Sequence, residues 1–265
     1  MTSAQSNLDE PILLESLDDG VLHVTLNRPG QFNALSEEML AALTQCMRAT
    51  ATGPEVRAVV IGAAGKAFCA GHDLRQMRAQ HGGSYYAALF ERCTEFMTSI
   101  IELPRPVIAR VHGVATAAGC QLVATCDLAI ASHSAQFAVS GINLGLFCST
   151  PSVALSRNVL RKRAFEMLIT GEFIDANTAV EYGLVNRAVD DDQLDDTIRT
   201  LTDAILRKPA VAVETGKRMF YRQAEMTLAD AYKFAGETMA RNMMAEDTVE
   251  GVDAFLEKRP PAWQR

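Results

Sequence analysis

Two short segments combine small residues with a position at the start of a predicted helix, and together they could act on an anion. The first segment is FCAGHDL at residues 68–74, and the second is GVATAAGCQL at residues 113–122. Each follows an apolar run that is typical of a buried strand. Small side chains let a backbone approach a ligand closely, and the first amides of a helix are unpaired and partly positive. Two such helix starts, brought together, could hold an oxyanion between two N–H donors.

The composition of the chain limits the kinds of ligand and partner that such a site can bind. A formal net charge of −7 over 265 residues argues against a general nucleic-acid surface, although a local basic patch for a phosphorylated ligand is compatible with it. No apolar run approaches the ~20 residues that span a bilayer, so we expect no membrane partner. Residues 1–10 resemble neither a secretory signal nor a transit peptide. We therefore expect a mobile N-terminal tail, a cytoplasmic protein and six reduced, mostly buried cysteines.

The elements that must position the two segments alternate between strands and helices. An apolar hairpin is predicted at residues 12–26, and Ser36 is a plausible cap for the helix that follows. Asp73 is expected to cap a second helix, and residues 85–103 form a third helix that ends before Pro104. Short buried strands are predicted at residues 58–61, 107–109 and 128–131. This alternation indicates βαβ units and a mostly parallel sheet.

The second half of the chain is predominantly helical. Helices are predicted at residues 161–170, 175–182, 191–206, 210–223, 228–244 and 249–263, with one strand at residues 184–189. We place the core at residues 11–200 and a C-terminal helical oligomerisation region at residues 201–265. The many apolar positions of that region favour an oligomer, because a lone chain would leave apolar faces in water.

Several motifs, taken in order, resemble the crotonase (enoyl-CoA hydratase/isomerase) superfamily. They are LNRP at 26–29, NAL at 33–35, KAFCAGHDL at 66–74, VHG at 111–113, CDLAIA at 126–131, NLGL at 143–146 and FLEKR at 255–259. Their order and spacing identify the chain as a member. The resemblance implies an α/β fold built as a spiral of ββα units, with a C-terminal helical trimerisation region. It also implies a homotrimer or a dimer of trimers.

The resemblance further implies an acyl-CoA thioester as the ligand, with coenzyme A present only as part of the substrate and no metal. By position, the backbone amides of His72 and Ala118 would donate to the thioester oxyanion. The side chain of His72 would lie beside the acyl group or pack structurally. The residues expected to bind coenzyme A are Arg28, Ala67, Phe68, Ala70 and, from a neighbouring subunit, Lys258. A solvated helix end is the alternative for Lys258.

The chain departs from the family pattern where acid/base chemistry is expected. Hydratases of the family use two glutamates, and Gln121 and Gly141 stand at those positions here. Glutamine can hydrogen-bond to water but cannot titrate, and glycine can do neither. Losing such a group typically costs ~10²–10⁴-fold in rate, so conventional hydration should be very slow. Cys148 and Ser149 occupy a third position that carries a carboxylate in some isomerases; the thiol would line the pocket and the hydroxyl could orient the substrate.

Three functions therefore remain open. The first is a hydratase/isomerase-type enzyme that acts through a thioester enolate. The second is a decarboxylase-like lyase that uses the oxyanion hole alone; the methylmalonyl-CoA decarboxylase type shares Ala-Gly-His-Asp but places a tyrosine where Cys148 stands. The third is a protein that binds acyl-CoA without turnover. The resemblance is closest to the enoyl-CoA hydratase domain-containing proteins of animal mitochondria, which share AAGCQL and GLFCSTP with this chain.

Overall fold

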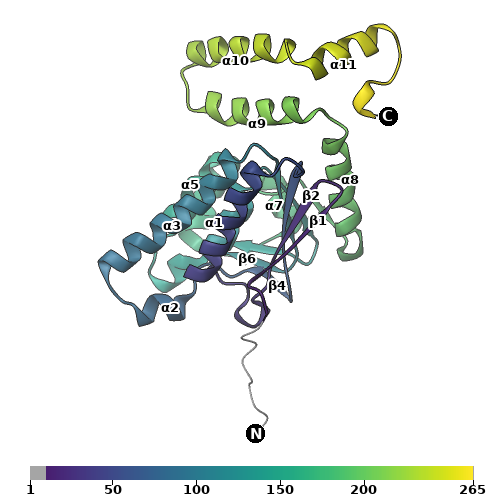
Figure 1. Ribbon diagram of the computed structural model, residues 1–265. Helices are drawn as coiled ribbons and strands as arrows, with labels where there is room; N and C mark the ends of the chain where they lie inside the picture. Colours follow the sequence, from purple (N-terminus) through teal and green to yellow (C-terminus); the bar gives the residue numbers. More distant parts are fainter. Residues whose placement is uncertain (1–9, 265) are drawn as a thin grey trace.

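The computed structural model describes residues 10–264 and contains two β-sheets at the centre of the molecule (Figure 1). The larger sheet has the strand order β1-β2-β3-β5-β7-β10, and all its neighbours are parallel except the β1–β2 hairpin. Its strands are β1 (Leu13–Asp18), β2 (Val21–Leu26), β3 (Ala58–Ala63), β5 (Val107–Val111), β7 (Leu128–Ser132) and β10 (Arg187–Val189). The hairpin and the parallel strands agree with the pattern predicted from the sequence. Residues 1–9 of the predicted N-terminal tail lie outside the described residues.

The smaller sheet has the order β4-β6-β8-β9 and consists of very short strands. They are β4 (Ala67–Cys69), β6 (Val114–Thr116), β8 (Gln136–Ala138) and β9 (Ile174–Asp175). The chain passes from the larger to the smaller sheet through residues 64–66, 112–113 and 133–135. Each passage joins two strands that precede a helical segment. The chain is therefore a spiral of ββα units, which confirms the predicted fold class.

Helices surround the sheets, and some of them begin at a side chain that caps the first turn. The helices of the core are α1 (Glu37–Thr52), α2 (Leu74–Ala79), α3 (Gly83–Glu102), α4 (Ala118–Thr125), α5 (Ser149–Asn158), α6 (Arg161–Thr170) and α7 (Ala176–Tyr182). Short 3-10 turns η1 (Pro29–Gln31), η2 (Ser140–Leu144), η3 (Asp191–Gln193) and η4 (Ala262–Gln264) complete the connections. The Ser36 hydroxyl accepts from the Met39 amide, and Asp73 accepts from Arg75 and Gln76, as predicted. Every residue of α4 is buried, so this helix lies inside the core.

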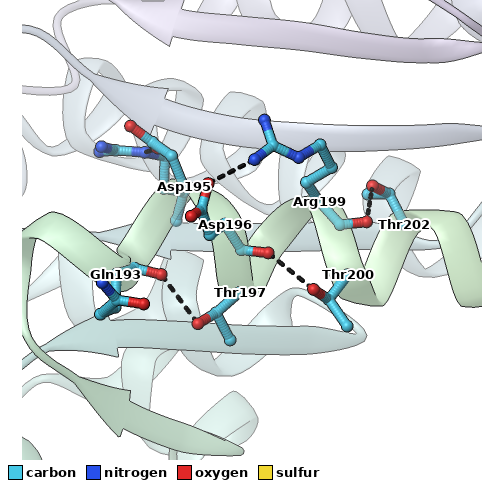
Figure 2. Close-up of polar contacts among 8 residues, drawn as sticks. Gln193, Asp195, Asp196, Thr197, Arg199, Thr200 and Thr202 are labelled. Atoms are coloured by element: carbon cyan, nitrogen blue, oxygen red, sulfur yellow. Dashed lines mark hydrogen bonds and ion pairs between the residues drawn. The ribbon is translucent and has the colours of Figure 1, made fainter.

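Helix α8 (Leu194–Leu206) covers the face of the larger sheet opposite to the main core. Val60, Ile108 and Ile130 point to α8, whereas the alternate residues of the same strands point to the main core. On the polar side, the hydroxyls of Thr197 and Thr200 donate to carbonyls one turn earlier at 2.8 and 2.9 Å (Figure 2). The predicted boundary between residues 200 and 201 falls inside α8. The apolar face of this helix continues to pack on the same sheet beyond residue 200.

Three further helices form a layer that stands away from the sheets (Figure 1). They are α9 (Ala210–Ala224), α10 (Leu228–Met243) and α11 (Glu246–Leu256). Lys217 ties α9 to the core, since its ammonium donates to the carbonyls of Ile100 and Arg105 and to Asp127 Oδ2 at 2.6 Å. The Tyr221 hydroxyl donates to the other oxygen of Asp127. Among the described residues, no helix is both long and apolar enough to cross a membrane.

Candidate active site

A cavity of about 290 Å³ lies between the first loop, the start of α4 and the segment that connects η2 to α5. Six residues singled out in the sequence line the cavity: Ala70, His72, Ala118, Gly141, Cys148 and Ser149. Apolar side chains of α2, α3 and the 144–147 turn supply much of the remaining wall. The structure thus brings together residues from segments that lie well apart in the sequence.

The two small-residue loops can approach each other closely because glycines stand at the contact, where a larger side chain would collide with the opposite loop. Gly71 has φ +90°, and a Cβ atom there would lie 3.1 Å from the amide nitrogen of Ala118. A Cβ atom on Gly119 would lie 2.1 Å from the carbonyl oxygen of Cys69, so only glycine lets α4 approach β4 this closely. Ala117, with φ 51°, makes the turn that starts α4 at Ala118. These contacts fix the amide of Ala118 beside the first loop.

Among the described residues, the backbone amides of His72 and Ala118 donate no hydrogen bond, although the carbonyl oxygens just before them each accept one. The Gly71 carbonyl accepts from the Leu35 amide at 2.8 Å, and the Ala117 carbonyl accepts from the Gln121 amide at 3.0 Å. Two adjacent N–H donors on a cavity wall can bind an oxygen atom that gains negative charge during a reaction.

The cavity contains no formal charge at neutral pH. None of the described residues that line it is an aspartate, glutamate, lysine or arginine, and its titratable side chains are His72 and Cys148. Burial lowers the pKa of His72 and raises the pKa of Cys148, so the imidazole and the thiol are both neutral at pH 7. An oxyanion would therefore meet only dipoles and N–H donors here.

The His72 ring is unusual because both of its nitrogens are buried and lack a hydrogen-bond partner within the described chain. The ring packs edge-to-face against Phe90, with 5.5 Å between the ring centroids. An unpartnered buried polar atom typically costs about 1–3 kcal/mol of stability. The sequence predicts a His72 side chain that lies beside the acyl group or packs structurally; the residue lines the cavity, and both of its ring nitrogens are shielded from it.

Gln121 and Gly141, at the positions of the family's glutamates, differ in their relation to the cavity. Gln121 is buried on α4 and its side chain does not line the cavity; its Oε1 atom has no hydrogen-bond partner. A Cβ atom on Gly141 would lie 2.7 Å from the Sγ atom of Cys148 and 2.7 Å from the Leu146 carbonyl oxygen. The Cys148 thiol, which donates to the Val139 carbonyl at 3.6 Å, thus occupies space that a residue-141 side chain would need.

Sequence reasoning missed a hydrogen-bonded pair of hydroxyl groups, one of which belongs to a residue that lines the cavity. Ser140 lines the cavity, and its hydroxyl shares a 2.8 Å hydrogen bond with the hydroxyl of Thr116. Ser149, which the sequence singled out, donates to the Phe147 carbonyl at 3.3 Å. Ser140 directly precedes the candidate residue Gly141, and this neighbouring position is the signal in the sequence that could have indicated it.

The residues expected to bind coenzyme A lie partly around the first loop. The side chain of Asn33 accepts from the Arg28 amide and donates to the carbonyls of Ala64 and Ala67, which holds the Arg28 loop against β4. The side chains of Ala67 and Phe68 are buried, so only their backbone could contact a ligand.

Lys258 is exposed and lies just beyond α11, a helix of the layer that stands away from the sheets (Figure 1). In the part of the chain that the structure describes, no group of three or more histidine, cysteine or acidic residues could hold a metal ion. The six cysteines are free and buried.

The two sheets and the helices together define an α/β protein of the ββα-spiral class. The chain belongs to the enoyl-CoA hydratase/isomerase family, whose model matches residues 16–265. A Xenopus laevis relative, enoyl-CoA hydratase domain-containing protein 3, mitochondrial, is 43% identical over 253 residues, which are 96% of this chain and 86% of that protein. Its Homo sapiens counterpart is 42% identical over 245 residues, which are 92% and 81% of the two chains.

Solved structures agree with this assignment. A Mycobacterium smegmatis structure described as an enoyl-CoA hydratase superposes with a TM-score of 0.95 at 60% identity and covers 97% of this chain and 100% of that one. Human enoyl-CoA hydratase domain-containing protein 3 gives a TM-score of 0.93 at 40% identity, with coverage of 96% and 100%. The family resemblance predicted from the motifs is therefore confirmed over nearly the whole chain.

Proposed function

We propose that this protein binds acyl-CoA thioesters and stabilises a thioester enolate between the backbone amides of His72 and Ala118. The observation that carries the proposal is the pair of unpartnered amides at two residues that line a neutral cavity. Negative charge that develops on the thioester oxygen would be met by donors already in place. Removing one such donor from an enzyme typically lowers the rate ~10²–10³-fold.

The cavity favours enolate chemistry over conventional hydration. Addition of water needs a group that activates the water and a group that delivers a proton. Gln121 does not line the cavity, and Gly141 has no side chain, so the family's two glutamate positions supply neither group. We expect hydration of crotonyl-CoA to be slower by ~10²–10⁴-fold for each missing group than in a hydratase that has both.

We further propose that coenzyme A enters only as part of the substrate and follows the Arg28 loop and the backbone of Ala67. The exposed Lys258 would reach a phosphate of coenzyme A from the partner subunit of a trimer, as a mobile point charge. This arrangement needs no permanently bound cofactor. A cytoplasmic location remains our prediction for the chain.

The Ala118 amide can be tested by substitution because Ala118 is the first residue of α4. Proline is tolerated at the first position of a helix and has no N–H group, so Ala118→Pro removes the donor. Ala118→Gly keeps the donor and serves as the matched control. Cinnamoyl-CoA is a suitable probe, since a hydrogen bond to its carbonyl oxygen polarises the conjugated acyl group and shifts its absorption to longer wavelength.

We expect the wild type and Ala118→Gly to bind cinnamoyl-CoA with a red shift, and Ala118→Pro to lose most of that shift. Isothermal titration would measure affinity in parallel, and circular dichroism would verify the fold of each variant. An equal shift in the proline and glycine variants, or no shift in the wild type, would contradict the proposed oxyanion site.

A further inference from the structure

The side chain of His112 joins two of the passages between the sheets. His112 lies in the passage at residues 112–113, and its Nε2 atom is 2.8 Å from the carbonyl oxygen of Gly65, in the passage at residues 64–66. The residue is partly exposed and does not line the cavity of the proposed site. The ring therefore stands outside the cavity but holds main chain that leads to it.

The two joined passages lead directly to the two amides of the proposed oxyanion site. Gly65 precedes His72 by seven residues, and His112 precedes Ala118 by six. One short strand lies in each interval, β4 in the first and β6 in the second, and the register of their pairing shifts between Ala67 and Cys69. An irregular ladder of this length constrains the two strands weakly. Contacts beyond the ladder must therefore contribute to the spacing of the loops that follow it.

At the start of the two strands, hydrogen bonds add to close packing. A Cβ atom on Gly113 would lie 2.1 Å from the carbonyl oxygen of Lys66, so the two passages touch here. The side chain of Asn33 donates to the carbonyls of Ala64 and Ala67 at 2.9 and 2.8 Å. The Asn33 bonds tie the first passage to the Arg28 loop, and the His112 bond ties it to the second passage.

The partners of the His112 ring define which nitrogen carries the proton. A carbonyl oxygen can only accept, so Nε2 carries the hydrogen and donates to Gly65. A guanidinium group can only donate, so the Arg110 Nη1 atom, 3.4 Å away, donates to Nδ1. Arg110 also forms an ion pair with Asp195 of α8. The ring is thus oriented by a group that is itself held by the helix on the other face of the sheet.

We propose that His112 is a positioning residue, whose hydrogen bond to Gly65 sets the spacing of the His72 and Ala118 amides. This inference rests on the proposed function, because the spacing matters only if both amides bind the same thioester oxygen. Such donors act at ~2.7–3.1 Å from the oxygen, and a displacement of ~1 Å can cost ~100-fold in rate. Without the His112 bond, we expect the second loop to move relative to the first.

Three substitutions at residue 112 separate the hydrogen bonds from the presence of a side chain. His112→Leu keeps a branched side chain and removes both nitrogens. His112→Ser keeps a polar group, but its hydroxyl oxygen ends where the ring begins and cannot replace Nε2. His112→Gln is the matched control, because its amide can donate to the Gly65 carbonyl and accept from Arg110. Circular dichroism verifies that each variant is folded.

The test measures the absorption of cinnamoyl-CoA at saturation and its affinity by isothermal titration. We expect the wild type and His112→Gln to give the same red shift, and His112→Leu and His112→Ser to lose most of it. The Kd should rise less than ~10-fold, because one hydrogen bond outside the cavity is lost. A role in folding alone would lower the urea midpoint of the variants and leave the red shift of the saturated, folded protein unchanged.

The other outcomes are distinguishable. A folded leucine or serine variant with the full red shift overturns the role of His112 and leaves the oxyanion proposal standing; if one of the two does not fold, the other decides. A glutamine variant that loses the shift as the leucine variant does overturns the hydrogen bond as the cause. A wild type without a red shift overturns the oxyanion proposal, and with it the inference about His112.

Discussion

At the scale of single residues, Gly141 and Cys148 behave as a pair. A side chain at residue 141 would collide with the Cys148 thiol and with the Leu146 carbonyl, both at 2.7 Å from the added Cβ atom. The position lacks the glutamate's carboxylate and also lacks room for its side chain, because the Cys148 thiol and the Leu146 carbonyl occupy that space. Restoring the carboxylate requires the 146–148 segment to move.

This pairing predicts a specific result in a double-mutant cycle. We expect Gly141→Ala to lower the free energy of unfolding by about 1–3 kcal/mol, because the added methyl group overpacks the site. Cys148→Ala should recover part of that loss by removing one of the two colliding atoms. Urea unfolding of the wild type, both single variants and the double variant would measure the coupling. Strict additivity would contradict the contact.

His72 predicts a difference in acid sensitivity. Burial holds its pKa in the folded state below the ordinary value of 6.5, so the unfolded chain binds a proton first as the pH falls. The free energy of unfolding should therefore decrease below pH 6.5 until the folded-state pKa is passed, by up to ~1.4 kcal/mol per pH unit.

The His72→Gln variant lacks this ring, so its stability should fall less between pH 7.5 and 5.5 than that of the wild type. Urea unfolding at both pH values measures the difference, in which contributions common to both proteins cancel. Parallel losses in the two proteins would show that the ring titrates alike in the folded and unfolded chains.

Sequence reasoning indicated candidate site residues but not their contacts. The motifs indicated His72, Ala118, Gln121 and Gly141, because small residues and helix starts follow a local pattern. The closed space between Gly141 and Cys148 and the unpartnered ring of His72 depend on residues distant in the sequence. No local pattern encodes such distances.

At the scale of elements, one buried ion pair joins the helical layer to the sheet. The side chains of Lys217 and Asp127 are 6% and 13% exposed, and Asp127 also accepts from the Val107 amide and the Tyr221 hydroxyl. Desolvation lowers the pKa of Lys217, and Asp127 opposes that shift. Removing one member would leave the other charge buried without its counterpart.

We therefore expect Lys217→Met to lower the free energy of unfolding by about 3–5 kcal/mol, measured by urea unfolding. The double variant Lys217→Met/Asp127→Asn should lose less than the sum of the single losses, because no charge is then left unpaired. A double variant whose loss equals the sum of the two single losses would contradict this description of the pair.

The predicted elements agree best where they are long. The hairpin, the buried strands of the larger sheet and the helices near residues 37–52, 161–170 and 210–224 appear close to their predicted positions. The smaller sheet escaped prediction because strands such as Ala67–Cys69 are too short to show a period. The helix predicted at residues 85–103 is α3, which begins two residues earlier at Gly83.

At the scale of the whole molecule, the outer helical layer exposes a large apolar surface. Phe220, Tyr232, Met239 and Phe255 are 64%, 74%, 71% and 82% exposed in a single chain. Exposed apolar surface of this extent typically marks an interface. It supports the association of subunits that the sequence predicts; three or six subunits, with Lys258 at the site of a partner, remain our prediction.

Light scattering coupled to size-exclusion chromatography tests this assembly. The chain has a mass of 28.8 kDa, and we expect the particle to have three or six times that mass. Dilution should leave the mass unchanged if the apolar layer forms a permanent interface. A particle with the mass of one chain at micromolar concentration would contradict the prediction.

The two amides at the meeting of the loops have a consequence for how such a protein changes over evolutionary time. They belong to the main chain, so every substitution at residue 72 or 118 except proline keeps an N–H group in its place. Apart from Gly71 and Gly119, whose contacts leave no room for a side chain, the residues around them can change without removing the donors. In the proposed site, a lineage could thus lose one reaction and acquire another while the same two N–H groups stay in place for the ligand.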